Sequence, residues 1–362
     1  MSQNTKAKQN VSDRVKSLIT SFEQDKSYSI SDVGDFDVAK TVSLATLKRD
    51  LSQLVKDNFL ILSGETRLAK YSLSAYGVIH REFETTGYHV NKDYKVVAMK
   101  SYNFNIFDFL KEENLFTEEE IKILDQATGT YHKRAIGKSE TIEKKELERF
   151  IIELSWKSSA IEGNTYSLLD TENLIRFGIV SGSNTKDEAI MILNHKKAFA
   201  CILEARKNSK SLLSFRELEN IHRLLVDGLG VNHGLRKVGV GITGTSYLPL
   251  DIVTQLEEES RKLIEVIKSK KDFYSKALIA VLGVSYLQSF EDGNKRTARL
   301  FANAMLVEGN YGPLSYRDVD ENEYRKAIVI FYEQNSVEAF KKIFIEQYVY
   351  ATSHYNIAPI TA

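Results

Sequence analysis

The residues best suited to chemistry lie in one short segment, Leu287 to Arg299, which reads LQSFEDGNKRTAR. Gly293 lets the backbone turn sharply and approach a ligand closely, and the free amides that open the next helix form an anion site. Arg296 and Arg299 project from the first turns of that helix, so several phosphates could be held at once. Asp292 beside those phosphates is a suitable magnesium ligand. The segment therefore predicts a polyphosphate site.

Helices must hold this segment in place. The apolar run from Ala277 to Leu287 predicts a buried helix directly before it. From about residue 140 onward the pattern is nearly all helical, except that the stretch from Gly234 to Pro249 predicts a β-hairpin because it is rich in glycine and β-branched residues. No run approaches the roughly 20 apolar residues needed to cross a bilayer, so no membrane partner is expected.

The first 90 residues follow a different pattern. Residues 29–55 predict two helices, the second with Ser43 as its N-cap and a leucine stripe behind it. Two strand-like runs, 59–62 and 68–73, flank a turn and predict a hairpin. The stripe consists of Leu44, Leu47, Leu51 and Leu54.

The segment 287–299 resembles the signature of the Fic/Doc family, written His-x-Phe-x-(Asp/Glu)-(Gly/Ala)-Asn-(Gly/Lys)-Arg-x-x-Arg. The resemblance covers roughly residues 145–350 and implies an all-helical core that binds ATP, or another nucleotide, with magnesium. Lys295 is compatible with AMP transfer and with the phosphorylation carried out by Doc toxins. Beside Phe290 and the magnesium ligand Asp292, the matching residues, expected to bind nucleotide, are Gly293, Asn294, Lys295, Arg296 and Arg299.

Two further segments agree with this family. Residues 158–163 resemble its inhibitory motif, Ser/Thr-x-x-x-Glu-Gly/Asn, on a helix at about 145–163, with Ser158, Glu162 and Gly163 in the motif positions. The resemblance implies that Glu162 pairs with Arg299 and blocks the productive γ-phosphate pose. The expected hairpin resembles the family's target-positioning flap, whose edge could bind a target protein by strand addition. Its expected residues are Val240, Ile242, Gly244 and Tyr247.

One departure from the signature decides the expected activity. Active members carry a catalytic histidine that deprotonates the target hydroxyl, which then attacks the α-phosphate of ATP. Gln288 stands at this position, and an amide neither accepts nor donates a proton, so about 10²–10⁴ in rate is lost. His222 lies on an apolar helical stretch and is expected in the core.

The leading hypothesis is a DNA-binding regulator whose Fic-like domain binds nucleotide and has lost or weakened AMP transfer. The alternative is a protein adenylyltransferase, transferring AMP from ATP to a target hydroxyl, that is autoinhibited by Glu162 and inactivated at Gln288. A third possibility is a scaffold whose flap binds a target peptide without chemistry.

A further helix is expected to begin near Val11. The resulting order of three helices and a hairpin is that of a winged helix-turn-helix, and residues 43–54 resemble the recognition helix of DeoR-type repressors. This resemblance implies double-stranded DNA as a partner, and a palindromic operator would imply a homodimer. Residues 1–90 hold 12 Lys and Arg against 11 Asp and Glu, a weak footprint for DNA, so a domain for protein contacts is the alternative. The expected DNA contacts are Thr46, Lys48 and Arg49 on the helix, with Arg67 and Lys70 on the wing.

The composition sets the wider limits. In 362 residues, 49 Lys and Arg balance 49 Asp and Glu, so no global field draws the chain to nucleic acid. The single Cys201 excludes an intramolecular disulfide, and the polar N-terminal residues lack an apolar signal core, so a cytoplasmic location is expected. The predicted fold class is mainly α: a small α+β winged helix-turn-helix at 1–90, a helical connector at 91–139, and an all-helical core with a β-hairpin flap at 140–362.

Overall fold

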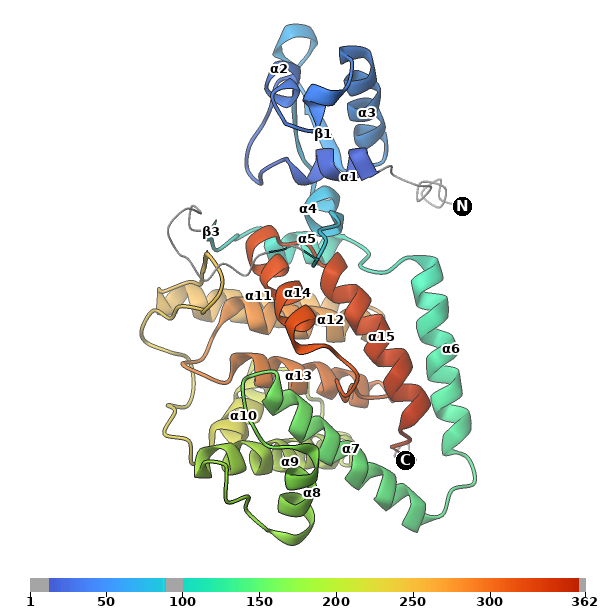
Figure 1. Ribbon diagram of the computed structural model, residues 1–362, viewed down its shortest axis with the longest axis vertical. Helices are drawn as coiled ribbons and strands as arrows, with labels where there is room; N and C mark the ends of the chain where they lie inside the picture. The colour runs from blue at the N-terminus through green and yellow to red at the C-terminus, as the bar shows by residue number, and fades with distance from the viewer. Residues whose placement is uncertain (1–12, 87, 89–99, 358–362) are drawn as a thin grey trace. The chain divides into compact units, whose positions relative to one another are not determined.

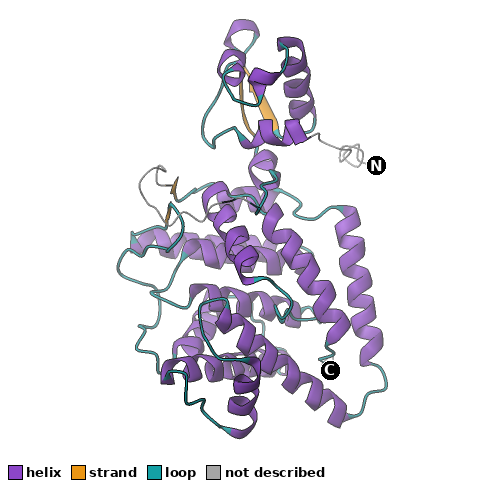
Figure 2. Ribbon diagram, in the orientation of Figure 1, coloured by secondary structure: helices purple, strands orange, loops and turns teal. Residues whose placement is uncertain are grey.

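The computed structural model describes residues 13–86, 88 and 100–357, which cluster into two compact units (Figure 1). Unit 1 comprises Met1–Tyr88 and Ile330–Ala339, and unit 2 comprises His89–Val329 and Phe340–Ala362. Helices form most of the regular structure (Figure 2), which confirms the predicted mainly α class. Every helix in the described ranges is too short or too polar to span a lipid bilayer.

Unit 1 has the predicted order of three helices and a hairpin. Strands β1 and β2 pair antiparallel with Leu60 opposite Leu73, and an isolated bridge joins Tyr28 to Tyr71 of the hairpin. The elements are α1 (Asp13–Thr20), α2 (Ile30–Gly34), η2 (Ala39–Thr41), α3 (Leu44–Lys56), β1 (Leu60–Ser63), η3 (Thr66–Leu68), β2 (Lys70–Leu73) and α4 (Ala75–His80).

Helix α3 is capped as predicted, but it buries only three of the four leucines of the predicted apolar stripe. The Ser43 side chain accepts a hydrogen bond from the backbone N–H of Thr46, which satisfies one of the free amides at the helix start. Leu47, Leu51 and Leu54 lie in the core of unit 1, whereas Leu44 is 58% exposed. The expectation for Leu44 was wrong because it is the first residue of α3 and precedes the turn that reaches the core.

Residues 330–339 return to unit 1 through contacts distant in sequence. The buried guanidinium of Arg81 donates to the carbonyl oxygens of Phe22 at 2.7 Å and Gln334 at 2.9 Å. Nδ1 of His80 lies 2.6 Å from Oε1 of Glu338. Because a buried guanidinium is costly without partners, these carbonyl acceptors help to hold the segment in this unit.

Unit 2 is built around two consecutive helices, α12 and α13, that pack along each other. Nearly every residue of α12 is buried, as expected for a helix that is apolar all round. Gly283 permits close packing, since a Cβ there would lie 2.5 Å from Cδ1 of Leu263 and 3.3 Å from Cε1 of Phe107. The elements are β3 (Lys100–Ser101), α5 (Ile106–Glu112), α6 (Glu118–Ala135), α7 (Glu140–Ala160), α8 (Leu168–Phe177), α9 (Lys186–Lys207), α10 (Phe215–Val226), β4 (Tyr247–Leu248), α11 (Val253–Ser269), α12 (Phe273–Leu287), α13 (Asn294–Glu308), α14 (Glu321–Gln334, of which Ile330–Gln334 belongs to unit 1) and α15 (Glu338–His354, which belongs to unit 2 from Phe340).

The hairpin predicted at 234–249 does not form. The segment is irregular until β4, and β4 pairs in parallel with β3 rather than with a neighbouring strand of the same segment. Arg236 explains much of this path: its side chain is buried and donates to the carbonyl oxygens of Gln288 at 2.6 Å, of Val238 at 2.8 Å and of Leu250. These carbonyls bind a side chain, which favours a loop wrapped around Arg236 over a regular strand pair.

Candidate functional site

The loop between α12 and α13 is shaped by its own side chains. Both Gln288 (φ +49°) and Gly293 (φ +79°) have left-handed backbone conformations and mark the ends of the two helices. Asn294 accepts from the backbone N–H of Phe290 at 2.9 Å and donates to the Phe290 carbonyl at 2.7 Å. Asn294 therefore fixes the loop from inside through both polar atoms of its amide.

Gly293 brings the backbone close to neighbouring side chains. A Cβ at this position would lie 3.1 Å from Cγ1 of Val226 and 3.7 Å from Cδ2 of His222. The positive φ and the tight packing both favour glycine. The first amides of α13 follow directly, and they lack carbonyl partners within the helix, so this is the positive end of its dipole.

Arg296 places a partly unsatisfied guanidinium beside these amides. Its side chain is 3% exposed, and Nη2 donates to Oδ2 of Asp292 at 2.9 Å. Nη1 has no hydrogen-bond partner among the described residues. Burial lowers the pKa of Arg296, an effect that the carboxylates of Asp292 and Glu162 oppose. A buried guanidinium nitrogen without a partner is costly, and an anion bound here would supply the missing acceptor.

Arg299, one turn further along α13, is completely buried and already engaged. Nη1 donates to Oε1 of Glu162 at 2.9 Å, while Nε and Nη2 donate to Oγ and the carbonyl oxygen of Ser158 at 2.9 and 2.7 Å. The Tyr324 hydroxyl lies 3.5 Å from Nη1. The ion pair between Glu162 and Arg299 implied by the resemblance is thus present in the structure.

Glu162 is held by a second cation. Its Oε2 lies 3.5 Å from Nζ of Lys295. Burial alone would raise the pKa of Glu162, but the charges of Arg299 and Lys295 outweigh it, and the net pKa is lowered. Glu162 is therefore a carboxylate at neutral pH, and it pairs with two of the three cations of α13.

The turn after α7 sets the position of Glu162. Gly163 has φ +96°, a conformation that suits glycine. The guanidinium of Arg325 donates two hydrogen bonds to the carbonyl oxygen of Ile161, at 3.1 and 2.8 Å. Asn164 donates to the carbonyl oxygen of Glu188 at 3.0 Å. The carboxylate of Glu162 is thus presented from a turn whose backbone is fixed on both sides.

Gln288 faces the helix that it ends. Its Nε2 donates to the carbonyl oxygen of Ser285 at 2.6 Å, and its own carbonyl accepts from Arg236. The side chain, 8% exposed, acts as a cap for α12. An amide in this position can supply no proton acceptor with a useful pKa.

The residues expected on the flap differ in burial and in the contacts that they make. Tyr247 is buried, stacks on Tyr286 with ring centroids 4.5 Å apart, and donates to the Tyr286 carbonyl at 2.9 Å. Val240 and Ile242 are half-buried in the irregular segment, where Gly244 is buried. The edge of β4 is paired with β3 of the same chain.

Asp292 is the side chain best placed for a divalent cation. Its carboxylate is 67% exposed and pairs with Arg296. In the described part of the chain, no cluster of three or more His, Cys, Asp or Glu side chains could hold a metal ion by itself. Magnesium commonly takes one or two carboxylates together with substrate phosphates and water, so a lone exposed Asp292 beside the free amides of α13 fits this ion.

His222 was expected only as a core residue, and it is buried, but it also supports the functional loop. Its ring stacks on Phe290 at 3.8 Å between centroids, and its Nε2 lies 3.0 Å from the Asp292 carbonyl oxygen. Burial lowers the pKa of His222 to about 4, so the ring is neutral and Nε2 donates to that carbonyl. A fully buried ring cannot meet a target hydroxyl, so His222 cannot serve as the general base of the Fic/Doc signature.

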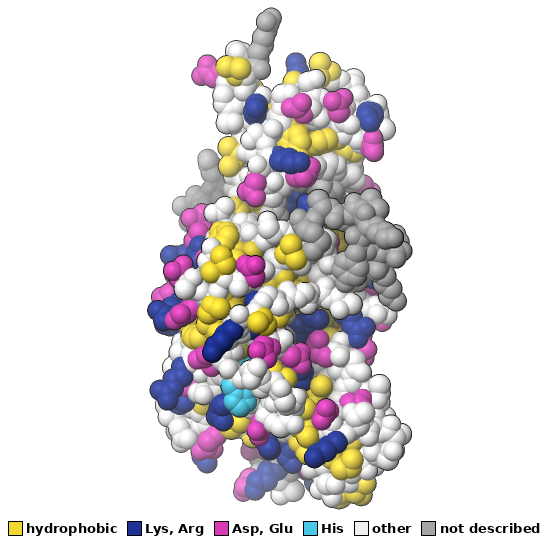
Figure 3. All heavy atoms as spheres, turned by 90° about the vertical axis from the view of Figure 1, so that its left-hand side faces the viewer, with side chains coloured by type: hydrophobic (Ala, Val, Ile, Leu, Met, Phe, Trp, Pro, Cys, Tyr) yellow, Lys and Arg dark blue, Asp and Glu magenta, His cyan; other side chains and the backbone are white. Residues whose placement is uncertain are grey.

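The residues expected to contact DNA lie on the α3 face and the hairpin of unit 1. Lys48, Arg49 and Lys70 are exposed, whereas Thr46 is half-buried and contributes to the cap of α3. The side chain of Arg67 lies outside the described residues. On the face drawn in Figure 3, the cationic and anionic side chains of the described residues are interspersed rather than gathered by sign.

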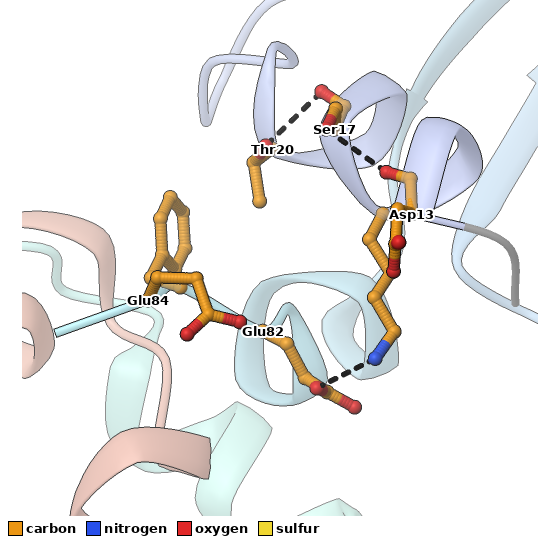
Figure 4. Close-up of a pocket in the computed structure, with 7 residues that line it drawn as sticks. Asp13, Ser17, Thr20, Glu82 and Glu84 are labelled. Atoms are coloured by element: carbon orange, nitrogen blue, oxygen red, sulfur yellow. Dashed lines mark hydrogen bonds and ion pairs between the residues drawn. The ribbon is translucent and has the colours of Figure 1, made fainter. Parts of the chain in front are cut away.

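A separate pocket in unit 1 offers less chemistry. Figure 4 shows Glu82 paired with Nζ of Lys16 at 3.1 Å, which raises the pKa of that lysine. Ser17 and Thr20 bind backbone carbonyls of α1. The lining consists of Asp13, Lys16, Ser17, Thr20, Glu82, Phe83 and Glu84, and we assign it no reaction.

Known proteins resemble the part of the chain that contains this site. The model of the Fic/DOC family matches residues 212–306. The curated proteins named protein adenylyltransferase Fic from Culex quinquefasciatus and Aedes aegypti are 25% and 24% identical over 179 residues, a stretch that covers 47% of this chain. The chain spans about a third (34%) of the length of these relatives.

Solved structures share the fold at lower identity. A Fic family protein from Desulfovibrio desulfuricans has a TM-score of 0.55 at 20% identity, covering 66% of this chain and 74% of that chain. Fic-1 from C. elegans has a TM-score of 0.53 at 18% identity, covering 66% and 71%. A Fic domain-containing signaling protein from Bacteroides thetaiotaomicron has a TM-score of 0.53 at 17% identity, covering 64% and 94%.

Proposed function

Because the chain contains a Fic/DOC family domain, we propose that this domain binds ATP with magnesium at the start of α13 and transfers AMP poorly or not at all. The observation that carries the proposal is the Arg296 guanidinium, which is buried beside the free amides of α13 and whose Nη1 lacks a partner among the described residues. A triphosphate supplies the oxygen acceptors that such a site lacks.

Each residue of the site has a separate role in this proposal. The amides after Gly293 and the Arg296 guanidinium bind phosphate oxygens, and Lys295 adds a point charge. Asp292 would hold magnesium, which neutralises phosphate charge when bound. Asn294 and His222 support the loop in this proposal: both polar atoms of the Asn294 amide bind Phe290, and Nε2 of His222 binds the Asp292 carbonyl.

Glu162 opposes binding. Arg299 can contact a γ-phosphate only when it releases Glu162, because Nη1 is committed to that carboxylate. Lys295 must also give up its contact with Glu162. Nucleotide affinity is therefore reduced by the cost of breaking these ion pairs, and the protein is autoinhibited.

Calorimetry with magnesium ATP tests this proposal. Glu162→Gly and Glu162→Gln should each bind ATP about tenfold more tightly than the wild type, since a hydrogen bond to a charged group contributes about 1.5–3 kcal/mol. Arg296→Ala placed in the Glu162→Gly background should abolish the gain, whereas Arg176→Ala, a surface arginine of α8, should not. Absence of ATP binding by Glu162→Gly would refute the proposal.

We propose further that unit 1 binds double-stranded DNA and that nucleotide occupancy regulates it. The support is the exposed face of α3, where Lys48 and Arg49 stand beside small and amide side chains, a combination suited to a major groove. Arg14 neutralises the one acidic residue on α3, Asp50, in a two-point ion pair at 3.0 Å for each contact. The alternative role is a protein contact.

A gel-shift experiment with genomic fragments at low salt distinguishes the two roles. The wild type should retard DNA, and Lys48→Ala combined with Arg49→Ala should remove that retardation, since two phosphate or base contacts are lost. The paired control is Lys144→Ala with Lys145→Ala, an exposed adjacent pair on α7 of unit 2. Lack of retardation by the wild type would leave the protein-contact role.

A second candidate function is protein adenylyltransferase, the name carried by the curated relatives. AMP transfer to any protein by the unmodified chain would favour it. Gln288 opposes it, because the side chain is a helix cap that cannot take up a proton.

A further inference from the structure

His195 lies behind the inhibitory ion pair and belongs to none of the motifs above. It sits on α9 and is completely buried. Its Nδ1 lies 2.9 Å from the carbonyl oxygen of Met191, and its Nε2 lies 2.9 Å from Oγ of Ser158. Ser158 is the residue that binds Arg299 through both its hydroxyl and its carbonyl oxygen.

The direction of every hydrogen bond in this chain of contacts can be deduced. A carbonyl oxygen only accepts, so Nδ1 of His195 must carry its proton and donate to Met191. Burial lowers the pKa of His195 to about 3, so the ring is neutral and Nε2 has a lone pair. The Ser158 hydroxyl therefore donates to Nε2, and its oxygen remains free to accept from Nε of Arg299.

The orientation of Arg299 depends on this arrangement. With Nε and Nη2 bound to Ser158, Nη1 is the nitrogen that faces Glu162, at 2.9 Å. If Nε2 of His195 carried a proton, the Ser158 oxygen would accept from both Nε2 and Nε of Arg299, and the hydroxyl proton would lose its acceptor. The guanidinium would then be held less firmly in the orientation that meets Glu162.

We propose that His195 is a positioning residue for autoinhibition: its Nε2 lone pair orients the Ser158 hydroxyl, which holds Arg299 in place for Glu162. The inference rests on the proposed inhibitory role of Glu162. We call the hydrogen bonds from His195 through Ser158 to Arg299 the relay. The relay is present in the ligand-free chain and can be measured without nucleotide.

The first test is the tautomer of His195, read by ¹⁵N NMR of histidine-labelled protein and assigned by loss of the signal in His195→Gln. The expected result is a ring protonated at Nδ1 only, with shifts unchanged from pH 8 to pH 5.5. A ring protonated at Nε2, or one that titrates near neutral pH, would overturn the proposal.

The second test compares two replacements. In His195→Gln the side-chain oxygen reaches the place of Nε2 and can still accept from Ser158, whereas His195→Asn replaces only the donor to Met191. We expect His195→Asn and Ser158→Ala to tighten ATP binding about threefold to tenfold, the value of one lost buried hydrogen bond, and His195→Gln to stay within about twofold of the wild type. Equal effects of the Asn and Gln variants would contradict a role for the lone pair.

A third test asks whether the effects of the His195 variants on ATP binding depend on Glu162. In the Glu162→Gly background, the Asn and Gln variants should bind ATP equally, because no inhibitory contact remains to be weakened. If the Glu162→Gly protein binds no ATP, the nucleotide proposal fails by itself. The relay is then tested by the tautomer of His195 and by urea denaturation of double variants. The effects of His195→Asn and Glu162→Gln on the free energy of unfolding should be non-additive, whereas those of His195→Gln and Glu162→Gln should be additive.

Discussion

In the proposed function, position 288 determines whether the site can transfer AMP as well as bind ATP. The Gln288 amide caps α12 through Ser285, and its backbone carbonyl is held by Arg236. The contact with Arg236 involves only the backbone of Gln288, so it remains when the side chain is replaced.

Placing an imidazole at position 288 should supply a general base for AMP transfer. Gln288→His combined with Glu162→Gly is expected to transfer AMP from α-labelled ATP to protein about 10²–10⁴ faster than Glu162→Gly alone, the usual contribution of a general base. Gln288→His alone should remain slow, because Glu162 still occupies Arg299. Equal transfer of label by the Glu162→Gly protein with and without the Gln288→His change would show that another base acts.

At the scale of elements, the site depends on the close approach of α12 to its neighbours. Leu263 of α11 and Phe107 of α5 are both completely buried against Gly283. Packed interiors transmit such constraints because they contain little free volume. The loop that follows α12 is therefore attached to a rigid helix.

Gly283→Ala should destabilise the protein by about 1–3 kcal/mol, since its Cβ would overlap Leu263 and overpacking has this cost. The matched control is Gly129→Ala in α6, where a Cβ meets nothing within 4 Å. That change should stabilise by about 0.5–1 kcal/mol through helix propensity. Urea denaturation measures both, and equal effects at the two positions would contradict the packing described here.

At the scale of the whole molecule, two buried neutral histidines couple stability to pH. The pKa of His195 is lowered to about 3 and that of His222 to about 4, from an ordinary value of 6.5, chiefly by burial. Between the folded and the ordinary pKa values the unfolded chain binds more protons than the folded chain, so the free energy of unfolding falls as the pH is lowered. The loss begins near pH 6.5 and continues toward pH 4.

The expected contribution of each histidine between pH 7 and pH 5 is a loss of about 2 kcal/mol in the free energy of unfolding. Urea titrations of the wild type and His195→Gln at both pH values isolate one of them. The variant should lose about 2 kcal/mol less than the wild type over this interval. The same pH dependence in both proteins would mean that His195 is not neutral in the folded state.

The sequence predicted those features of the fold that depend on interactions between nearby residues. The cap at Ser43, the turn at Gly293 and the apolar helix before it depend on residues within a few positions of each other, and each is found. The ion pair between Glu162 and Arg299 followed from the resemblance to the Fic/Doc family, since nothing in the spacing of 137 residues indicates it.

Long-range contacts account for what the sequence did not predict. The hairpin at 234–249 was wrong because the buried Arg236 binds a carbonyl 52 positions away, which no local pattern indicates. Apolar surroundings indicated that His222 would be buried but not that it would support Asp292. Similarly, Arg81 contacts Gln334, 253 positions away in the sequence. No local sequence pattern therefore predicts that residues 330–339 belong to unit 1.

A crystal structure of Glu162→Gly with ATP and magnesium tests the central claim most directly. The triphosphate should lie along the start of α13, with the γ-phosphate bound to Arg299 and a phosphate oxygen accepting from Nη1 of Arg296. An α13 terminus closed by side chains, or ATP bound elsewhere, would contradict a phosphate site that persists without its proton acceptor.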